Sequence, residues 1–343
     1  MKRPHIVHLI DDTTAGGVMR VLDHIRQSPD LARHAVHSFK QVKRGTLAFG
    51  RIDADVIVSH LTLNWRGLPG LFVLRASNAG RKLVHVEHSY TESFVALNVA
   101  KPRRFMAMLR IAFALFDKVV AVSKAQGKWM LRRDLLSSSG LRVIRSAVDL
   151  TEFTRLDPVS GPVRVIGAIG RLDTQKGFDL LITAFRALPE TGLKLAFYGE
   201  GPERPALEAL AAGDARISFE GFAADPMHAM SQVDAIAMPS RWEAYGLVAQ
   251  EALAAGRIVL VSGVDGLAEQ SDDGAVNVGG LTVAAWTREL GDLNGGGRTG
   301  APVKARLAHC AQSRRAFEAG WSGLFADLLG HEAGGGSASS RAA

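Results

Sequence analysis

Cations follow one of the apolar segments in the second half of the sequence. Arg171 comes directly after VRVIGAIG, and Lys176 lies five residues further on, ahead of Gly177 and a helix-like stretch. If a helix begins there, its free N–H groups and the two cations can hold a diphosphate between them. The alternative is a solvated turn with two ordinary surface cations. The residues of the neighbouring segments must decide between these two interpretations.

The stretch PSRWEAYGLVAQEALAAG, residues 239–256, adds two glutamates eight positions apart. Gly246 interrupts the chain before a predicted helix, with Gly256 as its C-cap. Glu243 then lies on the loop ahead of the helix, and Glu251 lies inside it. Taken alone, such a pair is a helix start and a surface charge. Beside a diphosphate site, two carboxylates that accept hydrogen bonds from hydroxyls predict a nucleotide-sugar site.

Short apolar segments alternate with helix-like segments along the whole chain. The strand candidates are residues 5–10, 55–60, 82–88, 118–123, 163–170, 193–199, 215–221, 233–240 and 257–262. This alternation predicts the α/β class, with doubly wound parallel sheets and right-handed crossovers. Ligands in such sheets bind beyond the carboxyl ends of the strands. Gly170 and Gly199 stand at two of these ends and allow the backbone to approach a ligand closely.

Length and composition predict two folded domains. The chain has 343 residues, of which 47% are hydrophobic and 22% charged, as in a globular protein with more than one core. Residues 154–162 contain two prolines and a glycine without periodicity, which favours a boundary there. We expect Rossmann-like domains over 1–155 and 156–300 that face a central cleft. One or two helices over 301–330 would pack back towards the N-terminal domain, and 331–343 would be a flexible tail.

Several other site types lack their motifs. The first predicted strand is followed by DDTTAGGVMR, without G-x-G-x-x-G, and no G-x-x-x-x-G-K-[ST] occurs, so neither a nicotinamide dehydrogenase nor a P-loop ATPase is supported. Asp53 and Asp55 form a D-x-D pair, which we interpret as solvated loop acids. The single cysteine, Cys310, excludes an intramolecular disulfide and speaks against zinc. We predict no metal and no cofactor.

The charge is distributed unevenly. Residues 1–150 contain 24 Lys and Arg against 11 Asp and Glu, whereas the remainder contains 17 against 23, which leaves a net charge of +7. A basic first half predicts an anionic partner: nucleic acid, an anionic membrane surface or a phosphorylated substrate. Because the sequence has no recognisable nucleic-acid-binding module, nucleic acid is the weakest of the three.

Residues 101–118 form a helix candidate that is apolar almost all round. Such helices are usually buried. The alternative is a helix on a leaflet surface, with Lys101, Arg103 and Arg104 at anionic head groups. No segment approaches the roughly 20 apolar residues of a membrane-spanning helix, and the first apolar run is too short for a signal peptide. We therefore expect a cytoplasmic protein, either soluble or peripheral on the inner face of the cytoplasmic membrane.

Residues 163–270 resemble the donor-binding domain of the family-4 glycosyltransferases, retaining enzymes of the GT-B fold. The resemblance rests on GRLDTQKGFDLLITAF, GEGPERPAL, FEGF and PSRWEAYGLVAQEALAAG, in the order and spacing of that family. The first half is more loosely similar, through DDTTAGGVMRVL, HVEHS, DKVVAVSKA and VIRSAVDLTEF. The resemblance implies transfer of a sugar from a UDP- or GDP-sugar to a hydroxyl, without a metal. The basic, apolar first half favours a glycan or lipid-linked acceptor in the synthesis of envelope polysaccharide, lipopolysaccharide or glycolipid.

The resemblance also implies roles for single residues of the second half. Arg171 and Lys176 would hold the donor diphosphate, and Glu251 would bind the ribose. Glu243 would contact the donor sugar, together with backbone N–H groups of the loop formed by Ala244, Tyr245, Gly246 and Leu247. No residue stands out as a nucleophile, which fits a front-face transfer in which the leaving phosphate accepts the proton of the acceptor.

In the first half, the resemblance implies that Gly16 and Gly17 let the first loop approach phosphate and acceptor. His88 would lie by the reacting sugar, with Glu87 as a rival for a polar role there. The chain departs from the family at Ser146 and Ala147, where Asn-Gly is usual. Two alternative functions stay open: a catalytically silent protein of this family that binds a nucleotide sugar, and a nucleic-acid-binding protein.

Overall fold

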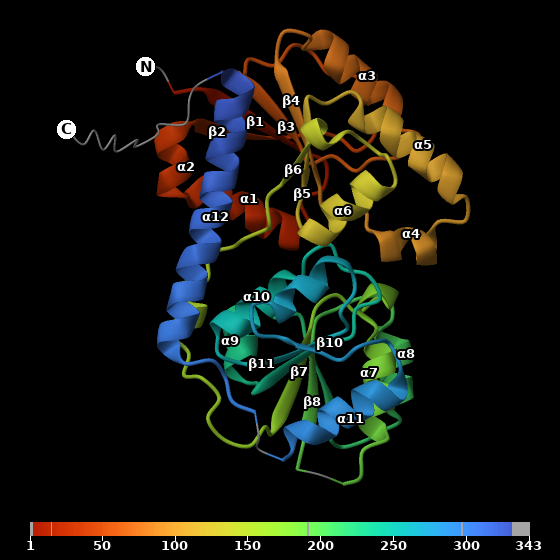
Figure 1. Cartoon of the computed structure of the whole chain (residues 1–343). Helices are drawn as coiled ribbons and strands as arrows, with labels where there is room; N and C mark the ends of the chain where they lie inside the picture. The colour runs from red at the N-terminus through yellow and green to blue at the C-terminus, as the bar shows by residue number, and fades with distance from the viewer. Residues whose placement is uncertain (1–2, 15, 191, 296–297, 331–343) are drawn as a thin grey trace, which may run out of the picture.

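The computed structural model describes residues 3–14, 16–190, 192–295 and 298–330. They form two parallel sheets, each with helices on both faces, placed one above the other (Figure 1). The strand order is β2-β1-β3-β4-β5-β6 in the first sheet and β12-β11-β10-β7-β8-β9 in the second. The predicted fold class, two Rossmann-like doubly wound domains, is confirmed.

The first domain builds its sheet from six short strands within the described residues. They are β1 (His5–Ile10), β2 (Val36–Gln41), β3 (Val56–Ser59), β4 (Lys82–Glu87), β5 (Lys118–Ala121) and β6 (Leu141–Val143). The helices around them are α1 (Gly17–Gln27), α2 (Pro29–His34), α3 (Leu68–Ser77), α4 (Glu92–Asn98), α5 (Pro102–Phe113) and α6 (Lys124–Arg132), followed by the 3-10 turn η1 (Ser138–Gly140).

The second domain repeats this plan after the 3-10 turn η2 (Phe153–Arg155). Its strands are β7 (Val165–Ile169), β8 (Lys194–Tyr198), β9 (Ile217–Gly221), β10 (Ala235–Met238), β11 (Ile258–Val261) and β12 (Val276–Asn277). Its helices are α7 (Phe178–Arg186), α8 (Arg204–Ala211), α9 (Pro226–Ser231), α10 (Leu247–Ala254) and α11 (Val283–Leu293), with the 3-10 turns η3 (Thr174–Lys176) and η4 (Asp265–Ser271).

The strands that the sequence did not reveal are β2, β6 and β12, and all three lie at sheet edges. Strands with two neighbours, such as β3, β10 and β11, are buried along their whole length. The three missed strands leave residues exposed or half-buried. An edge strand is not enclosed by neighbours, so its sequence lacks the continuous apolar run of a central strand.

A single helix of 27 residues, α12 (Val303–Leu329), closes the described chain and runs beside both domains (Figure 1). At its start, Arg306 donates hydrogen bonds to the carbonyls of Ala254 at 2.6 Å and Leu156 at 2.9 Å. Near its end, Glu318 accepts one from Ser28 of the first domain at 2.7 Å. The tail predicted over 331–343 lies outside the described residues.

Ion pairs join the two domains. Arg20 of α1 pairs with Glu251 of α10. Arg145, which follows β6, pairs with Asp273 at 2.7 Å and with Glu269 at 3.3 Å. The positive charge of the first half therefore serves in part to bind acidic side chains of the second half, and not only to bind an anionic ligand.

The candidate helix over 101–118 is shorter than predicted and is buried on one face only. α5 ends at Phe113, because the chain turns there to enter β5 at Lys118. Its buried residues are Met108, Leu109, Ala112 and Phe113, while Arg103, Arg104, Arg110 and Ile111 are exposed. No helix in the described ranges is long and apolar enough to cross a membrane.

Candidate functional site

The strand order predicts where a ligand would bind. In the second sheet the chain proceeds from β7 to β8 and β9 on one side, then returns to β10 on the other side of β7. The carboxyl ends of β7 and β10 therefore flank the crevice at which doubly wound sheets bind ligands. Gly170 and Arg171 follow β7, and the loop with Glu243 follows β10. In the first sheet the equivalent position lies between β1 and β3.

Lys176 and Glu243 meet at this crevice. The Lys176 Nζ lies 2.6 Å from Glu243 Oε2, and their side chains are only 17% and 14% exposed. Gly177 makes the approach possible: its φ is 66°, and a Cβ there would lie 2.2 Å from the carbonyl oxygen of Pro239. The turn before α7 can thus pack against the loop after β10, which brings together charges 67 residues apart in the chain.

The glycine turns after β7 and β8 also touch. Gly199 has a φ of 153°, and a Cβ at this position would lie 1.9 Å from the carbonyl oxygen of Gly170. Any side chain would therefore separate the two turns. The two predicted glycines therefore lie against each other at the ends of neighbouring strands.

Three helices beside these strand ends begin without a side-chain cap. The N-cap residues are Gly16 for α1, Gly177 for α7 and Gly246 for α10, and none can supply a side-chain acceptor. Their first N–H groups stay available for an anion. A Cβ on Gly17 would lie 3.2 Å from Leu247 Cδ1, so the first loop of the N-terminal domain contacts the start of α10.

Arg171 and Lys176, which we expected to converge on one ligand, have different partners in the structure. The Arg171 side chain is 71% exposed and its Nε donates to Asp173 Oδ2 at 2.5 Å. Asp173 lies two residues away and offers a nearer partner than the crevice. Lys176 pairs with Glu243 instead.

Glu251 is buried inside α10, with 1% of its side chain exposed. Its partner is Arg20 from the other domain, and burial lowers the pKa of that guanidinium. Arg20 was not among the predicted site residues, because a cation on the surface of an amphipathic helix carries no sequence signature.

Asp265 is a second residue that the sequence did not indicate. Its carboxylate accepts hydrogen bonds from Thr91 Oγ1 at 2.7 Å and from the Ser93 backbone N–H at 3.1 Å, both in the first domain. It also accepts from the backbone N–H of Glu243 at 3.3 Å. Asp265 therefore ties the loop that carries Glu243 to the segment that follows His88. The sequence shows only an Asp-Gly turn here.

His88 follows β4 and is half-buried. Its Nε2 lies 2.8 Å from Nδ1 of His60, and burial lowers its pKa to about 4. The rival Glu87 is occupied, since its Oε1 accepts from the backbone N–H groups of Ser89 at 2.8 Å and Tyr90 at 2.9 Å. Glu87 thus shapes the turn that presents His88.

The D-x-D pair has structural contacts. Asp55 accepts a hydrogen bond from the backbone N–H of His5 at 2.8 Å, and Asp53 is fully exposed and lies 3.7 Å from Arg81. Across the described part of the chain, no group of three or more His, Cys, Asp or Glu side chains is arranged to hold a metal ion.

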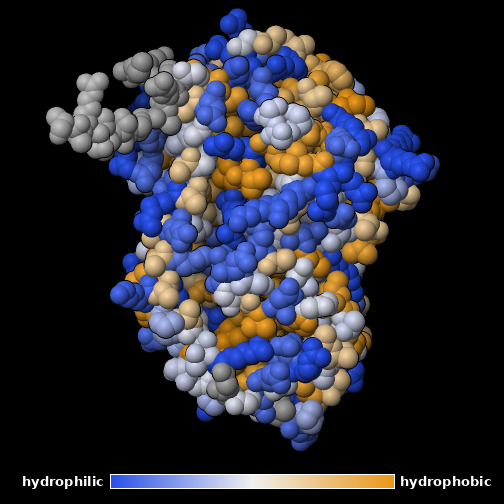
Figure 2. Space-filling model, viewed as in Figure 1, coloured by the Kyte–Doolittle hydropathy of each residue, from blue (hydrophilic) through white to orange (hydrophobic). Residues whose placement is uncertain are grey.

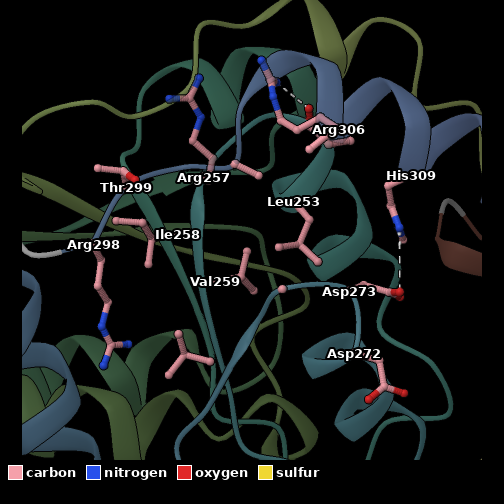
Figure 3. Close-up of a pocket in the computed structure, with 15 residues that line it drawn as sticks. Leu253, Arg257, Ile258, Val259, Asp272, Asp273, Arg298, Thr299, Arg306 and His309 are labelled. Atoms are coloured by element: carbon pink, nitrogen blue, oxygen red, sulfur yellow. Dashed lines mark hydrogen bonds and ion pairs between the residues drawn. The ribbon is translucent and has the colours of Figure 1, made fainter.

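A cavity of 460 Å³ lies between α10, β11 and the start of α12, away from Lys176 and Glu243 (Figure 3). Arg257, Arg298 and Arg306 line it. Figure 3 shows that the guanidinium groups of Arg257 and Arg298 point in opposite directions. Arg298 pairs with Glu289 at 2.9 Å and Arg306 binds backbone carbonyls. The cations do not converge on one ligand, so the cavity is not an anion site.

Comparison with known proteins places these features in one family. Residues 2–152 match the model described as Glycosyltransferase Family 4, and residues 163–292 match the one described as Glycosyl transferases group 1. The chain is 30% identical over 314 residues to D-inositol 3-phosphate glycosyltransferase of Salinispora tropica. This alignment covers 80% of the chain but only 63% of that relative.

Solved structures share the fold. Anabaena HepE in complex with UDP and glucose superposes with a TM-score of 0.67 at 17% identity, over 96% of this chain and 100% of HepE. WaaG, a glycosyltransferase involved in lipopolysaccharide biosynthesis, gives a TM-score of 0.61 at 16% identity, over 96% of this chain and 100% of WaaG.

Proposed function

This chain belongs to the family-4 glycosyltransferases with a GT-B fold, and on that premise we propose that it transfers a sugar from a UDP- or GDP-sugar to a hydroxyl with retention and without a metal. The observation that carries the proposal is the Lys176–Glu243 pair at the carboxyl ends of β7 and β10. Around it lie the uncapped starts of α7 and α10. The Lys176 cation and the two helix starts can bind a charged diphosphate. The Glu243 carboxylate can accept hydrogen bonds from the hydroxyls of a sugar.

The chemistry follows from the charges that develop. As the bond between the sugar carbon and the phosphate oxygen breaks, the sugar becomes positive and the diphosphate gains negative charge. In this proposal Lys176 and the N–H groups at the start of α10 stabilise the diphosphate. Arg171 can join them if its exposed side chain leaves Asp173.

The state of Glu243 argues against retention by a double displacement. Its carboxylate is bound by Lys176, so it is poorly suited to attack the sugar as a nucleophile. In the proposed front-face transfer, the acceptor oxygen bonds to the sugar carbon on the side from which the diphosphate leaves. The acceptor proton passes to the departing phosphate oxygen. Glu243 then orients sugar hydroxyls rather than forming a covalent intermediate.

A donor panel tests this proposal. We expect one UDP- or GDP-sugar to raise the Tm of the full chain in EDTA, because a ligand that binds only the folded state stabilises it by mass action, by about 2.7 kcal/mol at 100 times its Kd. The same donor should be hydrolysed or transferred with EDTA present. Stabilisation without turnover for any acceptor would instead favour a silent binding protein. If no nucleotide sugar shifts the Tm, the proposed site is wrong.

We assign the acceptor to the cell envelope because of the exposed surface of the N-terminal domain. Phe72 on α3 and Ile111 on α5 are exposed apolar residues, 51% and 39%, and Arg103 and Arg104 are exposed in the first turn of α5. Figure 2 shows hydrophobic residues over α3 with hydrophilic ones beside them over α5. The Arg104 guanidinium lies over the exposed Trp65 ring, 5.2 Å from its centroid. Such a surface suits the head-group region of an anionic leaflet.

Vesicle binding tests the membrane contact. The R103S/R104S variant should bind vesicles rich in anionic phospholipid about 30-fold more weakly than the unmodified chain, at about 1 kcal/mol for each cation. The control is R132S/R133S, which removes the same charge from the C-terminal end of α6, where both arginines pair with Glu92. Equal losses in the two variants would mean unspecific attraction and would refute a contact through α5.

A further inference from the structure

Four histidines form one hydrogen-bonded row across the sheet of the N-terminal domain. His88 Nε2 lies 2.8 Å from His60 Nδ1, His60 Nε2 lies 3.0 Å from His8 Nδ1, and His8 Nε2 lies 3.0 Å from His37 Nδ1. The rings stack along the row, with centroids 5.1 to 5.3 Å apart. His37 lies on β2, His8 on β1, His60 just after β3 and His88 just after β4, so four adjacent strands each contribute one ring.

The two inner rings, His8 and His60, are buried, and all four rings are uncharged at neutral pH. Burial lowers the pKa of His8 and His60 well below the usual range, and lowers the pKa of His37 and His88 to about 4. The neighbouring His rings, and Arg26 for His8, lower it further, while Glu87 opposes this at His88. α12 covers the His37 end of the row, where Trp321 packs on His8 and Phe325 packs on His37.

A neutral imidazole has one N–H and one bare nitrogen. Three consecutive bonds therefore leave two arrangements for the whole row, with all rings donating towards His88 or all donating towards His37. The tautomer of His88 is thus tied to the tautomer of His37, although β1 and β3 lie between them.

The His37 end of the row determines which of the two arrangements is present. Nε2 of His37 is buried and has no hydrogen-bond partner in the described part of the chain. Buried N–H groups without an acceptor are rarer than under-satisfied acceptors, so this nitrogen is the bare one. His37 then donates from Nδ1 to His8, and each ring donates to the next. The last ring, His88, accepts at Nε2 and carries its proton on Nδ1.

From this geometry we infer that His60, His8 and His37 are positioning residues, which lock His88 in the tautomer that donates a hydrogen bond from Nδ1. A row that ends at a buried nitrogen without a partner has no exit for a proton, so it holds a tautomer rather than conducting protons. Nδ1 of His88 makes no hydrogen bond to any described residue, and it is the atom left to bind an oxygen of the donor or acceptor. That last role rests on the proposed function; the tautomer lock does not.

Long-range ¹H–¹⁵N correlation spectra of the full chain with ¹⁵N-labelled histidine test the lock without any substrate. We expect one neutral tautomer for His88 at pH 7, with the proton on Nδ1. In His37→Met the terminal donor is replaced by a thioether, which can only accept a hydrogen bond. The arrangement with the His8 proton on Nε2 then gains a partner, so His88 should become a mixture of tautomers. His37→Asn keeps an amide donor near the position of Nδ1 and should restore the single form. Phe39→Leu is the packing control, since the Phe39 ring stacks on His8, 4.8 Å between centroids, without a hydrogen bond in the row.

Turnover of the donor gives the second readout. If the competent tautomer falls to between a half and a tenth of the population, kcat should drop by about 2- to 10-fold in His37→Met, with an unchanged KM for the donor. A proton on Nε2 of His88 in the unmodified chain, or an unaltered His88 tautomer in His37→Met, would overturn the inference. The first measurement needs no variant, so misfolding cannot hide the answer. If the chain turns over no donor, the proposed function is wrong. The spectra then still test whether the tautomer of His88 is locked.

Discussion

Lys176→Met is expected to lower kcat/KM for sugar transfer by about 100- to 1,000-fold, the loss typical of one preorganised group that stabilises transition-state charge. Methionine keeps much of the length and apolar stem of lysine but removes the charge. The effect should be large because Lys176 is held 2.6 Å from Glu243 in a mostly buried position, where little water can replace it. Initial rates with the donor found in the panel give the number.

Glu243→Gln should reduce the same rate, mainly through kcat, and the double variant should lose less than the product of the two single losses. The reason is that each residue holds the other, so either substitution disrupts both. Glu208→Gln is the matched control, since it removes one carboxylate from an exposed pair with Arg204 and should leave the rate unchanged. A Lys176→Met enzyme within threefold of the unmodified rate would refute the assignment of Lys176 to the diphosphate.

Glu251→Gln is expected to weaken donor binding by about 10- to 100-fold. Hydrogen bonds to a charged group contribute about 1.5–3 kcal/mol each, and glutamine would keep the shape while losing the charge. Isothermal titration of the donor measures the Kd directly. An unchanged Kd would be incompatible with Glu251 as the ribose ligand.

Arg20→Met separates binding from stability at the same pair. It leaves the carboxylate of Glu251, which is 1% exposed, without its cation. Removing one partner of a fully buried pair costs about 3–5 kcal/mol. Because Arg20 is 32% exposed, we expect a smaller loss of about 1–3 kcal/mol in the free energy of unfolding. Urea denaturation measures it. Arg26→Met on the same helix is the control, because the pair of Arg26 with Asp23 is exposed and local.

Much of the fold could be predicted from the sequence because it depends on local patterns. Buried strands such as β3 and β10 are continuous apolar runs, and α10 begins after Gly246 and ends before Gly256, as expected. The pattern failed where a strand is half solvated, at β2, β6 and β12. It also predicted too long a helix at α5, since apolar residues beyond Phe113 belong to a turn and not to another helical turn.

The residues of the candidate site divide in the same way. Lys176 and Glu243 could be proposed because each stands in a motif at the end of an apolar run, and the strand order then brings both to one crevice. Arg171 stands in such a motif too, but its side chain pairs with Asp173. Sequence position indicates which strand end carries a residue; it does not indicate where a long side chain points.

By itself, then, the sequence determined the α/β class, the two domains, the glycines of the turns and the acids and cations after the strands of the second half. These follow from the spacing of apolar residues and from backbone conformations that only glycine adopts easily. Only the tertiary structure decided that Arg20 meets Glu251, that Asp265 joins the Glu243 loop to the segment after His88, and that His37, His8, His60 and His88 form one row. The physical reason is that sheet order differs from chain order, so residues with no common sequence pattern become neighbours.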